Sequence, residues 1–293
     1  MTDQDATAAG RLRYPDFICI GAQKAGTTWL HQKLGQHPDV WLPAVKELHY
    51  FDALYSSEAI ATRTDAGRAE AALRNIEHLL QGGHSPVQKL ERIRAAASIG
   101  IREPTDEWYG KIFRDAPADS LCGETTPEYA LLPSRGVEHI ARLKPAVKII
   151  FIMRDPIDRA WSAMRMMQKR TGKAGATARD GAPQGAKFFE RADYAGTIDR
   201  FREHVPAANF LGMFFDDLEE QPRQFIEKLC EFLGIEFARG KFKGLQKRVH
   251  GGEKKDMDAG LYRKLRDELA PAYERLRASN DPIFAKWYRR HYG

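Results

Sequence analysis

The chain has 293 residues, of which 43% are hydrophobic and 29% are charged, and its formal net charge is +6. A chain of this length buries a substantial core, and these proportions fit an ordinary globular protein with one α/β domain and insertions. The composition predicts no membrane span, because no apolar run approaches the ~20 residues of a transmembrane helix. The mild positive charge suits an anionic cofactor or an anionic glycan, but a solvated basic surface has the same charge.

Residues 1–14 are polar and lack the apolar stretch of a signal peptide, which predicts a mobile tail before a single domain of residues 15–293. Three cysteines, Cys19, Cys122 and Cys230, are odd in number and lack the spacing of metal ligands. We therefore expect reduced thiols in a cytoplasmic protein without a bound metal.

A short apolar run, Phe17–Gly21, leads into a loop that ends at Gly26 and into a helix predicted over Trp29–Leu34. A strand, a tight loop and a helix N-terminus together bind phosphate well. The backbone N–H groups point at the anion, and the helix dipole adds partial positive charge there. This segment is therefore predicted to be a phosphate-binding loop.

The loop differs from the nucleotide triphosphate P-loop, G-x-x-x-x-G-K-[ST], in the place of its cation. Gly21 and Gly26 have the required spacing, but Thr27 follows the second glycine and the lysine stands three places earlier, at Lys24. In a kinase or GTPase the lysine after the second glycine reaches the β/γ-phosphates, and the next hydroxyl holds Mg²⁺. The displaced lysine indicates a different transferred group, with a P-loop kinase kept as an alternative.

A short apolar piece, Val40–Leu42, follows a turn, and apolar residues at helical spacing then run through residues 57–100. Breaks at glycine and proline divide this second stretch into two helical parts. The pattern predicts a helical insertion that lines a cleft.

A second buried strand is predicted over Lys148–Met153, followed by Arg154 and by a helix that starts near Pro156. Arg154 at the strand end and Ser162 on the helix, eight residues later, are spaced to converge on one phosphate. The planar fork of guanidinium donors suits phosphate oxygens. The structural alternative is an Arg–Asp pair that caps the helix.

Residues 171–185 are rich in Gly, Ala and Thr and are predicted to form a mobile loop. Asn209–Phe215 is predicted as a third strand, and Leu218–Leu233 as an amphipathic helix ended by Gly234. Strands that alternate with helices indicate βαβ units. The predicted fold is therefore α/β, with a P-loop-like central parallel β-sheet flanked by helices.

The segment Q-K-A-G-T-T-x-L at residues 23–30 resembles the 5′-phosphosulfate loop of sulfotransferases that use 3′-phosphoadenosine 5′-phosphosulfate (PAPS). With R-D-P-x-x-R-A-x-S from Arg154 to Ser162, it is most similar to heparan sulfate N- and 3-O-sulfotransferases and their bacterial relatives. The resemblance covers about residues 17–250. It implies PAPS as the sulfuryl donor and adenosine 3′,5′-bisphosphate as a product, with no metal. The residues that it places on the cofactor are Gln23, Lys24, Ala25, Gly26, Thr27, Thr28, Trp29, Arg154, Ser162, Lys247 and Arg248.

The same resemblance implies roles for these groups. Arg154 and Ser162 hold the 3′-phosphate, and Lys24 stabilises the negative charge that grows on the bridging oxygen. Lys247 and Arg248 belong to a basic segment, residues 241–255, that closes over the cofactor phosphates in the family. A solvated basic loop is the alternative for that segment.

An acceptor hydroxyl has a pKa far above 7 and needs a base as it attacks. In the family an acidic residue just before a His-Phe-Phe-like segment supplies that base, and Glu47 in K-E-L-H-Y-F-D matches it. His49 is the second candidate, with a packing or orienting role as its other reading. A surface carboxylate paired with Lys46 is the structural alternative for Glu47.

One position departs from the family pattern. Thr125 stands where a lysine is common in the heparan sulfate enzymes, which weakens the assignment of that substrate. Lys46 is the residue that would compensate.

The resemblance predicts in-line sulfuryl transfer to a hydroxyl or amine acceptor and, by analogy with the glycan enzymes, to a carbohydrate. No nucleic-acid partner is expected, and the oligomeric state is open. Besides the kinase, the alternative is a non-catalytic module that binds anionic glycans or nucleic acid through its basic loop.

Overall fold

The structure is a computed structural model. It describes residues 12–55, 76, 90, 93, 97, 104–171, 189–237, 241–246 and 257–293, with no side-chain description for 169–171. Four of the predictions fall outside this part of the chain. They are most of the N-terminal tail at residues 1–14, most of the helical insertion at residues 57–100, nearly all of the loop at 171–185, and the basic pair Lys247 and Arg248.

The centre of the fold is a five-stranded sheet with the order β2-β3-β1-β4-β5, in which every neighbouring pair is parallel. Its strands are β1 Phe17–Gly21, β2 Val40–Trp41, β3 Leu121–Thr125, β4 Lys148–Met153 and β5 Phe210–Phe214. All of β1 is buried, as is β4 after its first residue. Strands covered on both faces are apolar throughout rather than alternating, which explains why these two runs were recognisable.

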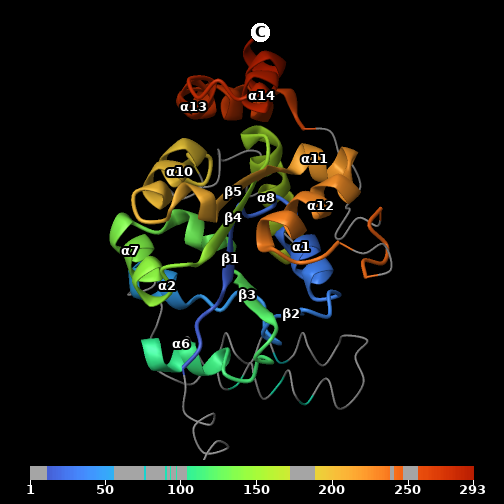
Figure 1. Ribbon diagram of the computed structural model, residues 1–293. Coiled ribbons are helices and arrows are strands. Elements are labelled where there is room, and N and C mark those ends of the chain that lie inside the picture. The colour runs from blue at the N-terminus through green and yellow to red at the C-terminus, as the bar shows by residue number, and fades with distance from the viewer. Residues whose placement is uncertain are drawn as a thin grey trace, which may run out of the picture.

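Helices cover both faces of the sheet (Figure 1), which confirms the predicted fold. In that view α7 and α10 lie on one side, and α1 and α12 lie on the other. The α-helices are α1 Thr27–Leu34, α2 Tyr50–Tyr55, α6 Asp106–Ile112, α7 Ser134–Leu143, α8 Pro156–Thr171, α10 Tyr194–Arg202, α11 Phe215–Glu220, α12 Pro222–Leu233, α13 Ala259–Arg277 and α14 Pro282–Tyr292. Two 3₁₀ turns, η1 Pro127–Leu131 and η2 Ala207–Asn209, complete the described elements.

Local sequence signals explain where several helices start and stop. Pro156 opens α8, and Asp155 Oδ1 accepts the N–H of Ile157 at 3.0 Å. Gly234, at φ 78°, ends α12 in the left-handed conformation that glycine adopts without strain.

The helix predicted over Leu218–Leu233 is two helices in the structure. The first, α11, ends at Glu220, and α12 begins at Pro222. Proline lacks the N–H that a continuous helix needs and restricts the residue before it, so the chain turns at Gln221.

The three cysteines are free and buried, as expected for reduced thiols. Burial raises the pKa of Cys19 to about 12, so this thiol is inert at neutral pH. Within the described residues, none of the helices combines the length and the apolarity of a membrane span.

Candidate active site

The predicted phosphate loop lies at the topological switch point of the sheet. From β1 the chain first builds β2 and β3 on one side, and then returns to build β4 and β5 on the other. In open parallel sheets the crevice at such a point, beyond the carboxyl ends of the strands, is where ligands bind. Residues 22–26 follow β1 at this end and lead into α1.

The loop has an unusual backbone. Lys24 has φ 72° and Gly26 has φ 87°, both in the left-handed region. A Cβ on Gly26 would lie 2.5 Å from Leu218 Cδ2, so the loop packs directly against α11. A non-glycine residue such as Lys24 is seldom found in this conformation, and such residues cluster at functional sites.

The N-terminus of α1 has no side-chain cap. Gly26 precedes the helix and has no side chain with which to cap it. The N–H groups of the first turn, from Thr27 to Trp29, have no acceptor within the helix because of its geometry. Trp29 itself is buried and packs edge-on against Phe225, with ring centroids 6.1 Å apart. This end of α1 therefore offers donors and partial positive charge to a phosphate.

Arg154 lies directly beside the loop, although 130 residues separate it from Lys24. Its Nη1 donates to the carbonyl of Lys24 at 3.0 Å, and its guanidinium lies 4.4 Å from the ring centroid of Phe215. Its own carbonyl accepts the hydroxyl of Tyr194 at 2.6 Å. The guanidinium of Arg154, at the end of β4, thus lies against the backbone of the loop that follows β1.

Ser162 is on α8, and its neighbour on the same helix face contacts the loop. Lys24 Nζ lies 3.7 Å from Sδ of Met166, which is four residues after Ser162. Residues four apart share one face of a helix. Ser162 therefore lies about one helical turn from the residue of α8 that the Lys24 side chain reaches.

The segment around Glu47 is fixed to the carboxyl end of β3, next to β1. The N–H of Glu47 donates to the carbonyl of Thr125 at 3.2 Å, and the N–H of Leu48 donates to Thr126 Oγ1 at 3.1 Å. Thr126 in turn donates its N–H to the carbonyl of Cys19 in β1 at 3.0 Å. Glu47 therefore lies at the same edge of the sheet as the phosphate loop.

Glu47 and His49 both have left-handed backbones, with φ 65° and φ 54°. Their side chains are linked, because His49 Nε2 lies 3.7 Å from Glu47 Oε2 and His49 Nδ1 lies 2.9 Å from Asp52 Oδ2. The ammonium of Lys46 donates to the other oxygen of Glu47. The result is a row of alternating charges.

These contacts decide the charge of both candidate bases. Burial opposes ionisation of Glu47, but the hydrogen bond from His49 and the charge of Lys46 outweigh it and lower the pKa of Glu47 to about 2. Burial also opposes the charge on His49, yet its hydrogen bonds to Asp52 and Glu47 raise its pKa to about 10. At neutral pH the arrangement therefore favours Glu47 over His49 as proton acceptor.

Asp52 was not singled out from the sequence, although it lies within the K-E-L-H-Y-F-D motif. It is buried, and it contacts His49 from the first turn of α2, three residues later. A histidine followed by an acidic residue at this spacing was the available signal.

Thr125, the position that departs from the family pattern, is fully buried, and its hydroxyl lies 3.4 Å from His31 Nδ1 of α1. Lys46 lies near the same place. The residue after Lys46, Glu47, donates its N–H to the carbonyl of Thr125 at 3.2 Å. A positive charge is thus present close to the site of the missing lysine.

The carboxylate of Glu124 lies next to the Glu47 segment, and the sequence did not reveal its burial. Glu124 accepts hydrogen bonds from Thr126 Oγ1 at 2.7 Å, from the Tyr129 hydroxyl at 3.3 Å and from the Tyr109 hydroxyl. Burial raises the pKa of Glu124 to about 7, although these bonds act in the opposite direction.

A second arginine, Arg159, follows Arg154 by five residues. Arg159 is fully buried, and this burial lowers the pKa of its guanidinium. The neighbouring charges of Arg191 and Arg154 lower this pKa further, whereas Tyr194 raises it. Arg191 is paired with both oxygens of Glu128, at 2.8 and 2.6 Å. Arg159 belongs to the R-D-P-x-x-R motif, so its presence was visible in the sequence but its burial was not.

The residues just before Lys247 and Arg248 are described and lie along α1. Lys33 Nζ donates to the carbonyl of Gly244 at 3.1 Å, and the N–H of Lys243 donates to Gln36 Oε1 at 2.8 Å. The start of the basic segment is therefore anchored to the helix that carries the phosphate loop at its other end.

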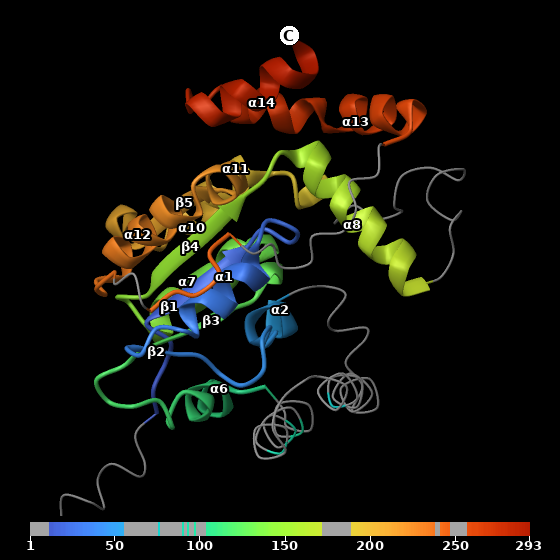
Figure 2. The ribbon, with the colours of Figure 1, turned by 90° about the vertical axis from the view of Figure 1, so that its right-hand side faces the viewer.

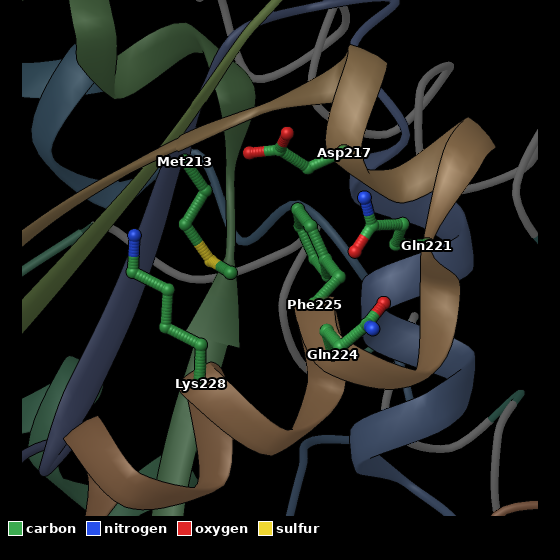
Figure 3. A pocket seen from close by; sticks show the side chains of 6 residues that line it. All are labelled: Met213, Asp217, Gln221, Gln224, Phe225 and Lys228. Carbon is green, nitrogen blue, oxygen red and sulfur yellow. The ribbon is translucent and has the colours of Figure 1, made fainter.

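A small hollow of about 100 Å³ lies along β5, α11 and α12, and Figure 3 shows the side chains around it. Its lining residues are Met213, Asp217, Gln221, Gln224, Phe225 and Lys228. It is smaller than the ~300 Å³ at which small-molecule pockets begin, and it contains none of the predicted site residues. We assign no role in nucleotide binding to it.

No group of three or more metal-ligating side chains occurs among the residues that the structure describes. The arginine, lysine and helix N-terminus at the switch point are donors that match phosphate oxygens, so the residues present fit an anionic nucleotide.

Comparison with known proteins points to one family. Residues 15–239 match the model of the sulfotransferase family. The chain is 28% identical over 151 residues to the membrane-associated sulfotransferase kil1 of Dictyostelium discoideum, a match over 50% of this chain and 22% of that protein. It is 22% identical over 237 residues to heparan sulfate glucosamine 3-O-sulfotransferase 6 of Mus musculus, over 78% of this chain and 55% of that one. The chain thus spans at most about half the length of these curated relatives.

Among solved structures, a sulfotransferase from Alicyclobacillus acidocaldarius has a TM-score of 0.62 and 21% identity, over 94% of this chain and 99% of that one. The sulfotransferase domain of the curacin biosynthetic pathway has a TM-score of 0.52 and 18% identity, over 79% of this chain and 77% of that one. At these identities the structures support the fold alone. Since the family model matches well over half of its residues, the chain belongs to the sulfotransferase family.

Proposed function

We propose that this protein transfers a sulfuryl group from PAPS to a hydroxyl or amine acceptor. The observation that carries the proposal is the hydrogen bond from Arg154 to the carbonyl of Lys24. It joins the two predicted phosphate-binding motifs of the sequence at one edge of the sheet, next to the uncapped N-terminus of α1. A donor with two separate phosphate groups needs two such anion sites side by side.

Each chain residue has a distinct role in this proposal. PAPS, when bound, supplies the activated sulfuryl group. Arg154, with Ser162 of α8, binds the 3′-phosphate. The loop amides and Lys24 bind the 5′ side, and there they stabilise the negative charge that develops on the leaving oxygen. Lys247 and Arg248 are proposed to cover the phosphates.

Glu47 is the proposed general base. Its carboxylate is ionised at neutral pH, whereas His49 is held as an imidazolium between Glu47 and Asp52 and orients the base. An acceptor that displaces Lys46 from Glu47 removes one charge that lowers the pKa of this carboxylate, and so makes it a stronger base.

A carbohydrate is the proposed acceptor class. The support is the similarity to heparan sulfate glucosamine 3-O-sulfotransferase 6, at 22% identity, together with the K-E-L-H-Y-F-D motif. Thr125 replaces the lysine that is common in the heparan sulfate enzymes, so we do not extend the proposal to that polymer. We also propose that residues 15–293 fold as one domain around this site.

The first experiment compares ligands by thermal shift. A ligand that binds only the native state raises the unfolding temperature by mass action. We expect adenosine 3′,5′-bisphosphate to stabilise the full chain and ATP with Mg²⁺ to have little effect. Stabilisation by ATP with Mg²⁺ alone would refute the proposal in favour of a kinase.

Two variants then separate binding from chemistry. Arg154→Ala should weaken binding of adenosine 3′,5′-bisphosphate and remove the preference for it over adenosine 5′-phosphate. Glu47→Gln should leave that binding nearly unchanged and lower turnover by about 10² or more, the contribution of a general base. Wild-type turnover in Glu47→Gln would remove Glu47 from its role.

Each variant has a matched control on the surface. Arg223, which is exposed and paired with Glu227, serves for Arg154, and Glu107, exposed and paired with Lys111, serves for Glu47. Neither Arg223→Ala nor Glu107→Gln should alter nucleotide preference or turnover. The loop lysine is tested by Lys24→Ala, which should also lose most turnover.

A further inference from the structure

The last two helices of the chain lie outside the part that matches the family model, yet they pack onto the candidate site. The model matches residues 15–239, whereas α13 and α14 cover Ala259–Tyr292. Both helices lie together across the end of the molecule where α8 begins, as Figures 1 and 2 show. The face of α14 that points inward includes Trp287 and His291, which are four residues apart and almost fully buried.

One inward contact is made to Asp155, the residue directly after Arg154. The carboxylate of Asp155 is 2% exposed and accepts the N–H groups of Ile157 and Asp158 at the start of α8. It also accepts the hydroxyl of Tyr273 of α13 at 2.7 Å. His291 Nε2 of α14 lies 2.8 Å from its other oxygen and acts as a donor, because an ionised carboxylate only accepts.

A second inward contact reaches the other side of Arg154. Trp287 Nε1 lies 3.3 and 3.2 Å from the two carboxylate oxygens of Asp216 in α11. The preceding residue, Phe215, carries the ring over which the Arg154 guanidinium lies. Trp287 also packs against Tyr194, whose hydroxyl holds the Arg154 carbonyl.

Arg154 therefore has three neighbours that link it to the C-terminal helices, namely Asp155, Tyr194 and, through Asp216, Phe215. Asp155, the residue after Arg154, is hydrogen-bonded to Tyr273 and His291. Phe215, whose ring lies under the guanidinium, is in α11, and Trp287 bonds the next residue of that helix. Tyr194, whose hydroxyl binds the Arg154 carbonyl, packs against Trp287. Hydrogen bonds to a buried carboxylate are stronger than neutral ones, and a buried charge that loses a partner is left partly unsatisfied. Contacts of this kind fix a backbone more rigidly than apolar packing alone.

We infer that α13 and α14 are part of the nucleotide site, and that Tyr273, His291 and Trp287 are positioning residues for Arg154. This inference rests on the proposed function, in which Arg154 binds the 3′-phosphate. Recognition of a phosphate by a guanidinium requires both donors to be aligned with the oxygens, so a displacement of about 1 Å has a large effect. The C-terminal helices thereby set the selectivity for a nucleotide that carries a 3′-phosphate.

The test uses a hydroxyl deletion with a matched control on the same pair of helices. Tyr273→Phe removes the bond to Asp155, and Tyr288→Phe removes a bond of similar length, 2.6 Å, to Glu274 within the pair. Titration calorimetry on the full chain gives the dissociation constants of adenosine 3′,5′-bisphosphate and of adenosine 5′-phosphate. We expect Tyr273→Phe to weaken the binding of adenosine 3′,5′-bisphosphate by about tenfold and to leave the binding of adenosine 5′-phosphate unchanged, so that the preference for the 3′-phosphate falls by about tenfold. Tyr288→Phe should leave both constants unchanged.

Trp287→Phe is the second variant. It keeps an aromatic ring in the core but removes the N–H bond to Asp216, so it reaches Arg154 by the other route. If Tyr273→Phe or Trp287→Phe folds and keeps the wild-type ratio, as Tyr288→Phe does, the inference is wrong and the helices only stabilise the fold. A merely structural role would lower the unfolding temperature without changing nucleotide preference.

The outcome also separates this inference from the proposed function. If the wild-type protein does not prefer the 3′-phosphorylated nucleotide, the proposed function fails. If the wild type has that preference and Arg154→Ala loses it while the Tyr273 and Trp287 variants retain it, the proposed function stands and only the positioning role is refuted.

Discussion

The phosphate loop offers a sharp test of the structural reasoning, because Gly26 has no room for a side chain. Its φ of 87° lies in the left-handed region, where an alanine costs about 1 kcal/mol. An added Cβ would also lie 2.5 Å from Leu218 Cδ2 and 3.3 Å from the ring of Phe215. Such overpacking in a buried place costs about 1–3 kcal/mol. We therefore expect Gly26→Ala to lower the free energy of unfolding by about 2–4 kcal/mol.

The matched control is Gly35 at the other end of the same helix, α1. Its φ of −66° and ψ of −7° are those of an ordinary residue, and a Cβ there would have its nearest neighbour, the carbonyl of His31, at 3.4 Å. Gly35→Ala should change the free energy of unfolding by less than about 0.5 kcal/mol, or raise it slightly by restricting the unfolded chain.

Urea unfolding followed by far-ultraviolet circular dichroism measures both variants against the wild type, with the slope of the transition compared as well. If Gly26→Ala loses no more stability than Gly35→Ala, the loop does not have the backbone or the packing described here. The structural description of the predicted phosphate-binding loop would then be wrong.

Three further outcomes are expected. The pKa of Glu47 is lowered to about 2 and that of His49 is raised to about 10, so neither group should change its charge between about pH 5 and 8, and turnover should show no pH dependence from this pair in that range. If the pH–rate profile has an inflection near pH 6.5 that His49→Asn removes, His49 titrates as an ordinary histidine and is not held as an imidazolium. Burial raises the pKa of Glu124 to about 7, above its unfolded value of about 4.3, so the native state binds the extra proton between these values. The free energy of unfolding should therefore fall by about 2–3 kcal/mol as the pH rises from about 5 to 8. In urea unfolding, Glu124→Gln should remove most of this pH dependence. If the variant and the wild type have the same pH dependence, the raised pKa of Glu124 is refuted. Excess EDTA should leave turnover unchanged, because ammonium, guanidinium and amide donors stabilise the charge in the proposed reaction; activity lost and restored by Mg²⁺ would overturn this.

The sequence predicted the centre of the sheet well and its sides less well. β1 and β4 were recognisable because both are apolar over almost their whole length, as strands covered on both faces must be. β3, Leu121–Thr125, was missed, because its sequence L-C-G-E-T contains a glycine, a glutamate and a threonine. Its burial depends on β1 and on the tyrosines around Glu124, and neither is encoded within the strand itself.

The candidate site divides in a similar way. The phosphate loop and the arginine motif were readable, since glycine spacing and a strand-to-helix junction are local features. The contact between Arg154 and Lys24, and the chain of charges from Lys46 to Asp52, appeared only in the folded molecule. The roles of Glu47 and Ser162 stay predictions that the proposed variants test.

What the amino-acid sequence determined by itself was therefore the set of local elements: the strands β1, β4 and β5, the loop, the helix start at Pro156 and the helix end at Gly234. The tertiary structure alone decided which of these elements meet. Tyr273 and His291 lie 118 and 136 residues from Asp155 along the chain, and no periodicity or spacing links them. Their contact arises because a buried carboxylate must be satisfied by whatever donors the packed helices bring to it, and packing is a property of the whole fold.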